Sequence, residues 1–159
     1  MPAFRPTDLR FIDQTLRLAR KGQGRTAPNP MVGAVIVKRG KVVGRGYHHR
    51  AGWPHAEVEA FNSAATDVAG ATLYVNLEPC SHHGRTPPCV DAIIRAGIKR
   101  VVCCTLDPNP EVNGRGRAKL LAAGIEVAVG LRAKEARALN AEFFARHENN
   151  VPRPGWDDA

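Results

Sequence analysis

The sequence predicts an α/β fold of three layers (α/β/α) built around a mixed β-sheet. Two apolar, β-branched runs at residues 33–38 and 42–47 are joined by a short turn containing Gly40, which is the pattern of an antiparallel hairpin. Helical and strand patterns then alternate three times before a last helical pattern, which indicates parallel strands covered by helices. We therefore expect an opening antiparallel hairpin followed by parallel strands.

The elements of the first half follow from periodicity and from the residues that interrupt it. A helix is expected to begin with Thr7 as its N-cap and to run to about Lys21, since apolar side chains recur on one face. Residues 25–30 (RTAPNP) are expected to form a rigid loop, because each proline fixes its φ angle and removes an amide donor. After the hairpin, a helix over residues 55–65 is expected to lead to a strand over residues 72–77.

The second half continues the alternation. A helix is expected to begin near residues 87–88, to turn Val90, Ile93 and Ile94 inward, and to stop at Gly97. The remaining elements are expected to be a strand over 100–105, a polar loop over 106–116, a helix over 117–123, a strand over 125–129 and a last helix from 133 to about 147.

Composition limits the class of protein. Residues 1–150 are expected to form one domain, followed by a tail over residues 151–159 that shows no periodicity. No apolar run is long enough to span a membrane. The 4 cysteines are too few for a disulfide scaffold, which favours a reducing cytoplasm, and Cys103 and Cys104 are expected to be small core residues.

The chain is basic, with a net charge of +8. Such a balance is compatible with nucleic acid, with an anionic small molecule or with a solvated surface. The arginines are scattered, and no Lys/Arg block is interleaved with aromatic residues for base stacking. We therefore expect a phosphorylated small-molecule substrate rather than nucleic acid.

The chemistry is indicated by His55, Glu57, Cys80 and Cys89. One imidazole and two thiolates suit a zinc ion whose fourth tetrahedral position stays open, and a glutamate two residues after the histidine can carry protons. His-x-Glu followed by Pro-Cys and a second cysteine is the signature of zinc nucleobase deaminases. We therefore expect one Zn²⁺ per chain with Glu57 as the acid/base.

Two other interpretations of these residues stay open. His55 could be a helix cap beside core cysteines, or the zinc site could be closed and structural. A closed site needs a fourth ligand. His82, His83 or Glu57 could supply it.

The chain resembles the deaminase domain of the bifunctional riboflavin-biosynthesis deaminase/reductase, within the zinc cytidine/deoxycytidylate deaminase superfamily. The resemblance covers about residues 8–150 and includes the long insert between Cys80 and Cys89. Its motifs are residues 28–33 (PNPMVG), 44–48 (GRGYH), 52–57 (GWPHAE), 77–89 (LEPCSHHGRTPPC), 107–110 (DPNP) and 114–116 (GRG).

This resemblance implies a cytidine-deaminase-like fold and deamination of 2,5-diamino-6-(5-phosphoribosylamino)pyrimidin-4(3H)-one. It also implies substrate contacts, namely Asn29 and His48 at the pyrimidine, and Arg85, Asp107 and Asn109 toward the ring and the ribose phosphate. Each has a structural alternative, because Asn29 and the Asp107–Asn109 stretch could be turn formers, and His48 and Arg85 could be solvated surface residues.

This chain departs from the family pattern after the deaminase region. Residues 153–156 (RPGW) do not resemble the start of a reductase domain, so we expect that domain to be absent and a separate reductase to act in the pathway. We also expect a homo-oligomer. The alternatives are a deaminase of a tRNA base or of cytidine, and a non-catalytic, zinc-stabilised interaction domain.

Overall fold

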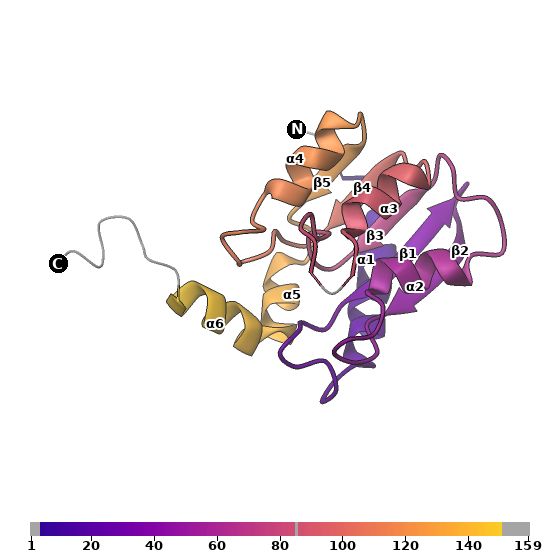
Figure 1. Ribbon diagram of the computed structural model, residues 1–159. Helices are drawn as coiled ribbons and strands as arrows, with labels where there is room; N and C mark the ends of the chain where they lie inside the picture. The colour runs from indigo at the N-terminus through magenta and orange to yellow at the C-terminus, as the bar shows by residue number, and fades with distance from the viewer. Residues whose placement is uncertain (1–3, 85, 151–159) are drawn as a thin grey trace.

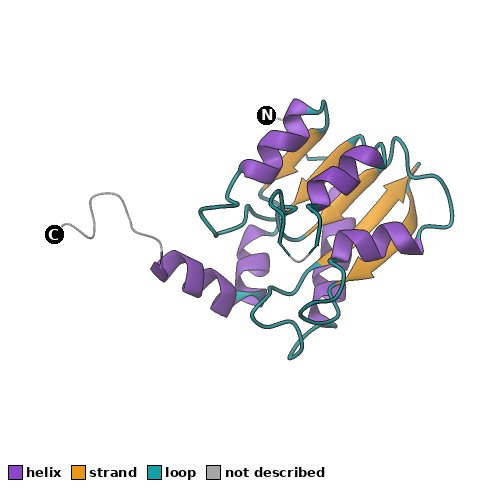
Figure 2. Cartoon of the chain, in the orientation of Figure 1, coloured by secondary structure: helices purple, strands orange, loops and turns teal. Residues whose placement is uncertain are grey.

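A five-stranded sheet runs through the protein in the order β2-β1-β3-β4-β5 (Figures 1 and 2). The structure is a computed structural model and describes residues 4–84 and 86–150, without the side chains of residues 149 and 150. The strands are β1 (Gly33–Lys38), β2 (Lys41–Tyr47), β3 (Thr72–Val75), β4 (Arg100–Cys103) and β5 (Glu126–Val129).

The sheet is mixed, as the sequence predicts. Strand β1 pairs antiparallel with both β2 and β3, so parallel pairing begins at β3 and continues through β4 to β5. The β1–β2 turn has positive φ at Arg39 and Gly40 (52° and 78°). This is the combination of a type I′ hairpin turn, whose twist matches that of the strands.

Helices cover both faces of the sheet and complete the three layers. They are α1 (Asp8–Arg20), α2 (Ala56–Ser63), α3 (Cys89–Arg95), α4 (Arg115–Ala122), α5 (Ala133–Leu139) and α6 (Ala141–Asn150). Helices α2, α3 and α4 share one apolar cluster with the sheet, and α1 and α5 share a second cluster on the opposite face. Alternate residues of β1 divide between the clusters, with Ala34 and Ile36 in the first and Val35 and Val37 in the second.

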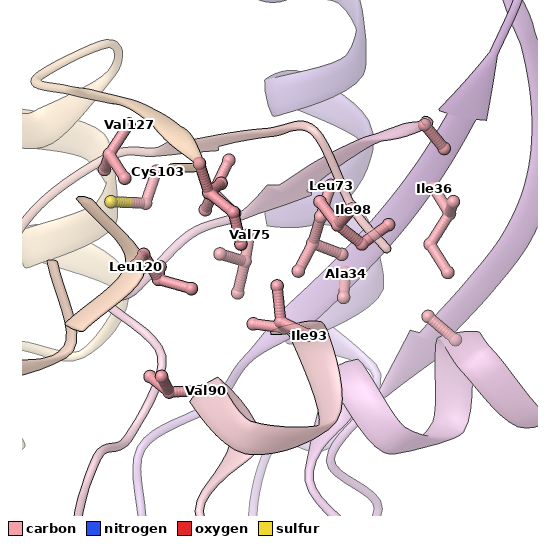
Figure 3. Packing of buried hydrophobic residues seen from close by; sticks show 14 of the residues in the cluster. Ala34, Ile36, Leu73, Val75, Val90, Ile93, Ile98, Cys103, Leu120 and Val127 are labelled. Atoms are coloured by element: carbon pink, nitrogen blue, oxygen red, sulfur yellow. The ribbon is translucent and has the colours of Figure 1, made fainter. Parts of the chain in front are cut away.

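Helices α2 and α3, which pack in the first cluster, carry His55 and Cys89 at their N-terminal ends. In Figure 3, Ile93 of α3 points toward Val75 and Ala34 of the sheet. Helix α2 lies very close to β2, because a Cβ atom at Gly46 would be 2.5 Å from the backbone nitrogen of Ala60. Only glycine permits this approach, which sets the position of the α2 N-terminus.

Two local expectations were wrong. The last helix is two helices, α5 and α6, with a break at Asn140 (φ −113°, ψ 38°). Ile94 is 39% exposed, because it lies to the side of the buried stripe formed by Val90 and Ile93. Thr7 is the N-cap residue of α1, as expected, although its side chain makes no capping hydrogen bond.

The core expectations for β4 were correct. All of its residues are buried, and Cys103 and Cys104 are 1% and 0% exposed. The expected tail over residues 151–159 lies outside the described residues.

Candidate functional site

Three metal-type ligands converge at the N-terminal ends of α2 and α3. His55 is the N-cap residue of α2, Cys89 is the first residue of α3, and Cys80 lies in the loop after β3. One ligand atom from each lies within 4.8 Å of the other two. His55 Nδ1 is 3.3 Å from Cys89 Sγ and 3.6 Å from Cys80 Sγ, so the three side chains surround a common point.

The electrostatics of the two thiols suit a divalent cation. The hydrogen bond from the Cys89 thiol, together with that from His55, lowers the pKa of Cys80 to about 4. The backbone N–H of Cys89 also donates to Cys80 Sγ at 3.2 Å. The shared hydrogen bond and burial raise the pKa of Cys89 instead. Two adjacent thiols cannot both ionise readily unless a cation lies between them, so this donor set fits Zn²⁺.

The ligand group is one short of a closed tetrahedron. Across residues 4–84 and 86–150, no fourth histidine, cysteine or carboxylate joins it, and His82 and His83 are exposed. A structural zinc site would be completed by protein, whereas an open position leaves room for water or substrate. This geometry favours the catalytic interpretation.

Glu57 lies in the first turn of α2, beside the ligand group. Its side chain is 4% exposed, and burial raises its pKa to about 7. A carboxyl group with a pKa near neutrality can both accept and release a proton in the working pH range. Glu57 therefore has the burial and the position expected of a general acid/base.

One pocket of about 550 Å³ contains most of the expected site residues. Those among its lining residues are Asn29, His48, His55, Glu57, Cys80, Asp107 and Asn109. Cys89 is not among them and is buried at the start of α3. Arg85 lies outside the described residues, so its placement stays a prediction.

Asn29 and His48 are joined by a directed hydrogen bond. His48 is 3% exposed, and its Nδ1 lies 3.0 Å from the carbonyl oxygen of Pro54. A carbonyl can only accept, so Nδ1 carries the proton and Nε2 accepts from Asn29 Nδ2 at 3.2 Å. Burial lowers the pKa of His48, which favours this neutral form. The Oδ1 atom of Asn29 is thus the acceptor that this side chain can offer to a ligand.

Asp107 and Asn109 reach the pocket from the loop after β4. Asp107 Oδ1 accepts the N–H of Asn109 at 2.9 Å, and Asn109 Oδ1 accepts the N–H of Glu111 at 3.0 Å. These are turn-forming bonds, so both residues shape the loop as well as lining the pocket. Burial raises the pKa of Asp107 to about 6.

Glu78 orders that loop and was not anticipated. Its carboxylate is 4% exposed and accepts three backbone N–H groups, from Asp107 (3.1 Å), Gly114 (3.0 Å) and Arg117 (2.9 Å). The bond from Arg117 satisfies a free amide in the first turn of α4. Its position two residues before Cys80 was the one local feature that could have suggested a role for Glu78. Its partners could not be inferred, because they lie far along the chain.

Helix α6 forms another side of the pocket. Phe143, Arg146 and His147 line it, and Phe143 and His147 contact edge to face with ring centroids 4.6 Å apart. The sequence predicted a helix here but no site residue, because nothing local to this segment indicates what it packs against.

No helix in the described part of the chain has the length and apolarity needed to cross a bilayer.

Comparison with known proteins points to the same chemistry. Residues 5–105 match the family described as the cytidine and deoxycytidylate deaminase zinc-binding region. The riboflavin biosynthesis protein RibD of Aquifex aeolicus is 61% identical over 140 residues, which are 88% of this chain and 39% of that protein. The diaminohydroxyphosphoribosylamino-pyrimidine deaminase of Buchnera aphidicola is 46% identical over 142 residues, covering 89% of this chain and 97% of that protein.

A solved structure of a relative has the same fold. The diaminohydroxyphosphoribosylaminopyrimidine deaminase/5-amino-6-(5-phosphoribosylamino)uracil reductase of Thermotoga maritima superposes with a TM-score of 0.87 at 47% identity. The match covers 92% of this chain and 42% of that one. This chain therefore spans about two fifths of the length of these two-part relatives, and nearly all of the Buchnera protein.

Proposed function

Because this chain belongs to the cytidine and deoxycytidylate deaminase family, and within it to the diaminohydroxyphosphoribosylaminopyrimidine deaminases, we propose that it deaminates 2,5-diamino-6-(5-phosphoribosylamino)pyrimidin-4(3H)-one. The products would be 5-amino-6-(5-phosphoribosylamino)uracil and ammonia, in riboflavin biosynthesis. The observation that carries this proposal is one pocket containing His55, Cys80 and Glu57 together with neutral hydrogen-bonding side chains.

His55, Cys80 and Cys89 would hold one zinc ion per chain. A zinc ion supplies Lewis acidity, which lowers the pKa of water to roughly 7 and so makes a nucleophile available at neutral pH. Glu57 moves the protons. Its carboxylate takes one proton from the attacking water and passes it to the ring nitrogen. It then takes the remaining proton of the same oxygen and gives it to the leaving amine, so that the carbonyl forms as ammonia departs.

The remaining pocket residues orient the substrate. Asn29 Oδ1 can accept a hydrogen bond from the pyrimidine, while His48 holds the Asn29 amide in place. Asp107 and Asn109 are proposed to contact the ring and the ribose, and Arg85 the phosphate, since a guanidinium binds phosphate through two parallel hydrogen bonds.

The cellular setting and the assembly state are also part of the proposal. We propose that the protein works in the cytoplasm, where its thiols stay reduced, and that it forms a homo-oligomer. A reductase would consume its product. The reductase half of the Thermotoga relative indicates that these two reactions belong together.

One set of assays tests the proposal. Zinc content is measured first, and ammonia release is then measured with the phosphorylated diaminopyrimidine and with cytidine. Ammonia from the phosphorylated diaminopyrimidine alone supports the proposal. Ammonia from cytidine alone, or RNA binding that weakens steeply with salt, would indicate a nucleoside or RNA deaminase instead. One zinc per chain without ammonia from either pyrimidine would indicate an interaction domain.

A further inference from the structure

Asn140, at the break between α5 and α6, uses its side chain to bind the segment before β1. It is 6% exposed and makes two hydrogen bonds to the backbone of Met31, which is 109 residues away in the sequence. Oδ1 accepts the Met31 N–H at 2.8 Å, and Nδ2 donates to the Met31 carbonyl at 2.8 Å. The amide group thus pairs with Met31 as a neighbouring strand would.

A second buried amide completes this arrangement. Asn76, which is 1% exposed at the end of β3, donates to the Met31 carbonyl at 3.0 Å and accepts the N–H of Gly33 at 2.9 Å. The Met31 carbonyl therefore uses both of its acceptor positions. Each amide has only one orientation that pairs donors with acceptors, so the network is unambiguous.

The segment held in this way presents Asn29 to the pocket. Pro28 and Pro30 have no N–H, so this stretch has few backbone donors of its own and depends on side chains from elsewhere. Helix α6 supplies a further bond, from Arg146 Nη1 to the Pro28 carbonyl at 3.1 Å. The α5–α6 junction and α6 therefore hold the segment on both sides of Asn29.

We propose that Asn140 is a positioning residue for substrate recognition, because it holds Met31 so that Asn29 meets both His48 and the pyrimidine. This inference rests on the proposed function, since it assigns Asn29 to the substrate. Asn140 is not among the residues that line the pocket, so any effect on substrate binding must pass through the segment that it anchors.

The primary test is the Asn140→Ala variant. We expect KM for the phosphorylated diaminopyrimidine to rise on the order of tenfold, as the loss of two hydrogen bonds would produce. Zinc content should stay the same and kcat should change much less. Hydrogen exchange at the Met31 amide should become faster. The matched control is Arg132→Ala, which removes an ion pair between α5 and Asp13 (3.0 Å) without touching Met31. This control should leave both KM and the exchange rate unchanged.

A double-mutant cycle with Asn29→Ala separates positioning from general stability. If Asn140 acts through Asn29, adding Asn140→Ala to the Asn29→Ala variant should raise KM little further. Additive effects, or an unchanged KM in Asn140→Ala, would overturn the inference. An unmodified protein that releases no ammonia from the phosphorylated diaminopyrimidine would overturn the proposed function itself, and this inference with it.

Discussion

Asp8 and Arg100 form a doubly hydrogen-bonded ion pair inside the protein, although they are 92 residues apart in the sequence. Nη1 and Nη2 of Arg100 donate to Oδ1 and Oδ2 of Asp8, each at 2.8 Å, and the two side chains are 2% and 0% exposed. The Tyr74 hydroxyl also donates to Asp8 Oδ1, at 2.6 Å. This pair joins α1 to β4 on the side of the sheet opposite the metal-type ligands.

Removing the charge of Asp8 should destabilise the fold. In Asp8→Asn the buried guanidinium faces a neutral amide and keeps its ion pair with the partly exposed Glu126 (2.7 Å). Removing the buried partner of such a pair costs about 3–5 kcal/mol. We expect the free energy of unfolding in urea to fall by that order. The matched control is Asp13→Asn, whose ion pair with Arg132 is partly exposed and should contribute less than about 1 kcal/mol. Equal losses in the two variants would contradict the assignment.

The ion pair of Asp8 and Arg100 should also make the free energy of unfolding depend on pH in the acid range. Burial alone would raise the pKa of Asp8, but the hydrogen bonds that its carboxylate accepts, first of all from Arg100, outweigh burial and lower the pKa from 3.8 to about 2. Because the folded pKa is below the unfolded one, the stabilisation is complete above about pH 4 and is lost as the pH falls toward 2.

The measurement is the difference in unfolding free energy between the unmodified protein and Asp8→Asn. Taking the difference cancels the pH dependence contributed by the titratable groups that both proteins share. It should shrink by about 2 kcal/mol between pH 4 and pH 2. A difference that stays constant with pH would show that folding does not lower the pKa of Asp8.

Glu57→Ala should abolish turnover while preserving the zinc site. The carboxyl group is not a member of the ligand group, so metal content should stay the same. Loss of a positioned acid/base should lower the rate of ammonia release by about a hundredfold or more. Glu59→Ala, on the same helix and paired with His49, is the control and should remain active. A fully active Glu57→Ala protein would contradict the proposed mechanism.

Glu78→Gln should impair substrate binding more than chemistry. A glutamine keeps the shape of the side chain, but its NH₂ group cannot accept, so at least one of the three buried N–H groups loses its partner. That loss should cost about 1–3 kcal/mol of stability. Because the affected loop carries Asp107 and Asn109, KM should rise while zinc content stays the same. Glu111→Gln, an exposed change on the same loop, should behave like the unmodified protein. Loss of zinc in Glu78→Gln would show instead that this residue supports Cys80.

Arg85→Ala tests the proposed phosphate contact. KM for the phosphorylated substrate should rise strongly, because a guanidinium–phosphate pair is lost, whereas zinc content should not change. A dephosphorylated analogue should already be a poor substrate and should be affected little. Arg95→Ala, an exposed arginine on α3, serves as the control. Equal losses on both substrates would mean that Arg85 supports the insert rather than the phosphate.

The sequence by itself determined the layered α/β architecture, because period-two and helical patterns are local and each repeats over several residues. It also determined which side chains are chemically suited to a metal, since His55, Cys80, Cys89 and Glu57 are recognisable by type and spacing. Local signals fix neither the exact ends of elements nor which side chains of a helix are buried, so the break at Asn140 and the exposure of Ile94 were missed.

Only the tertiary structure decided the contacts that hold the site in shape. Asn140 meets Met31, Glu78 meets the loop around Gly114, and Arg100 meets Asp8, each across a long separation in the sequence. The physical reason is the same in all three cases. A buried polar group must find a partner, but which partner it finds depends on how distant segments pack, and an isolated asparagine or glutamate in the sequence carries no sign of that choice.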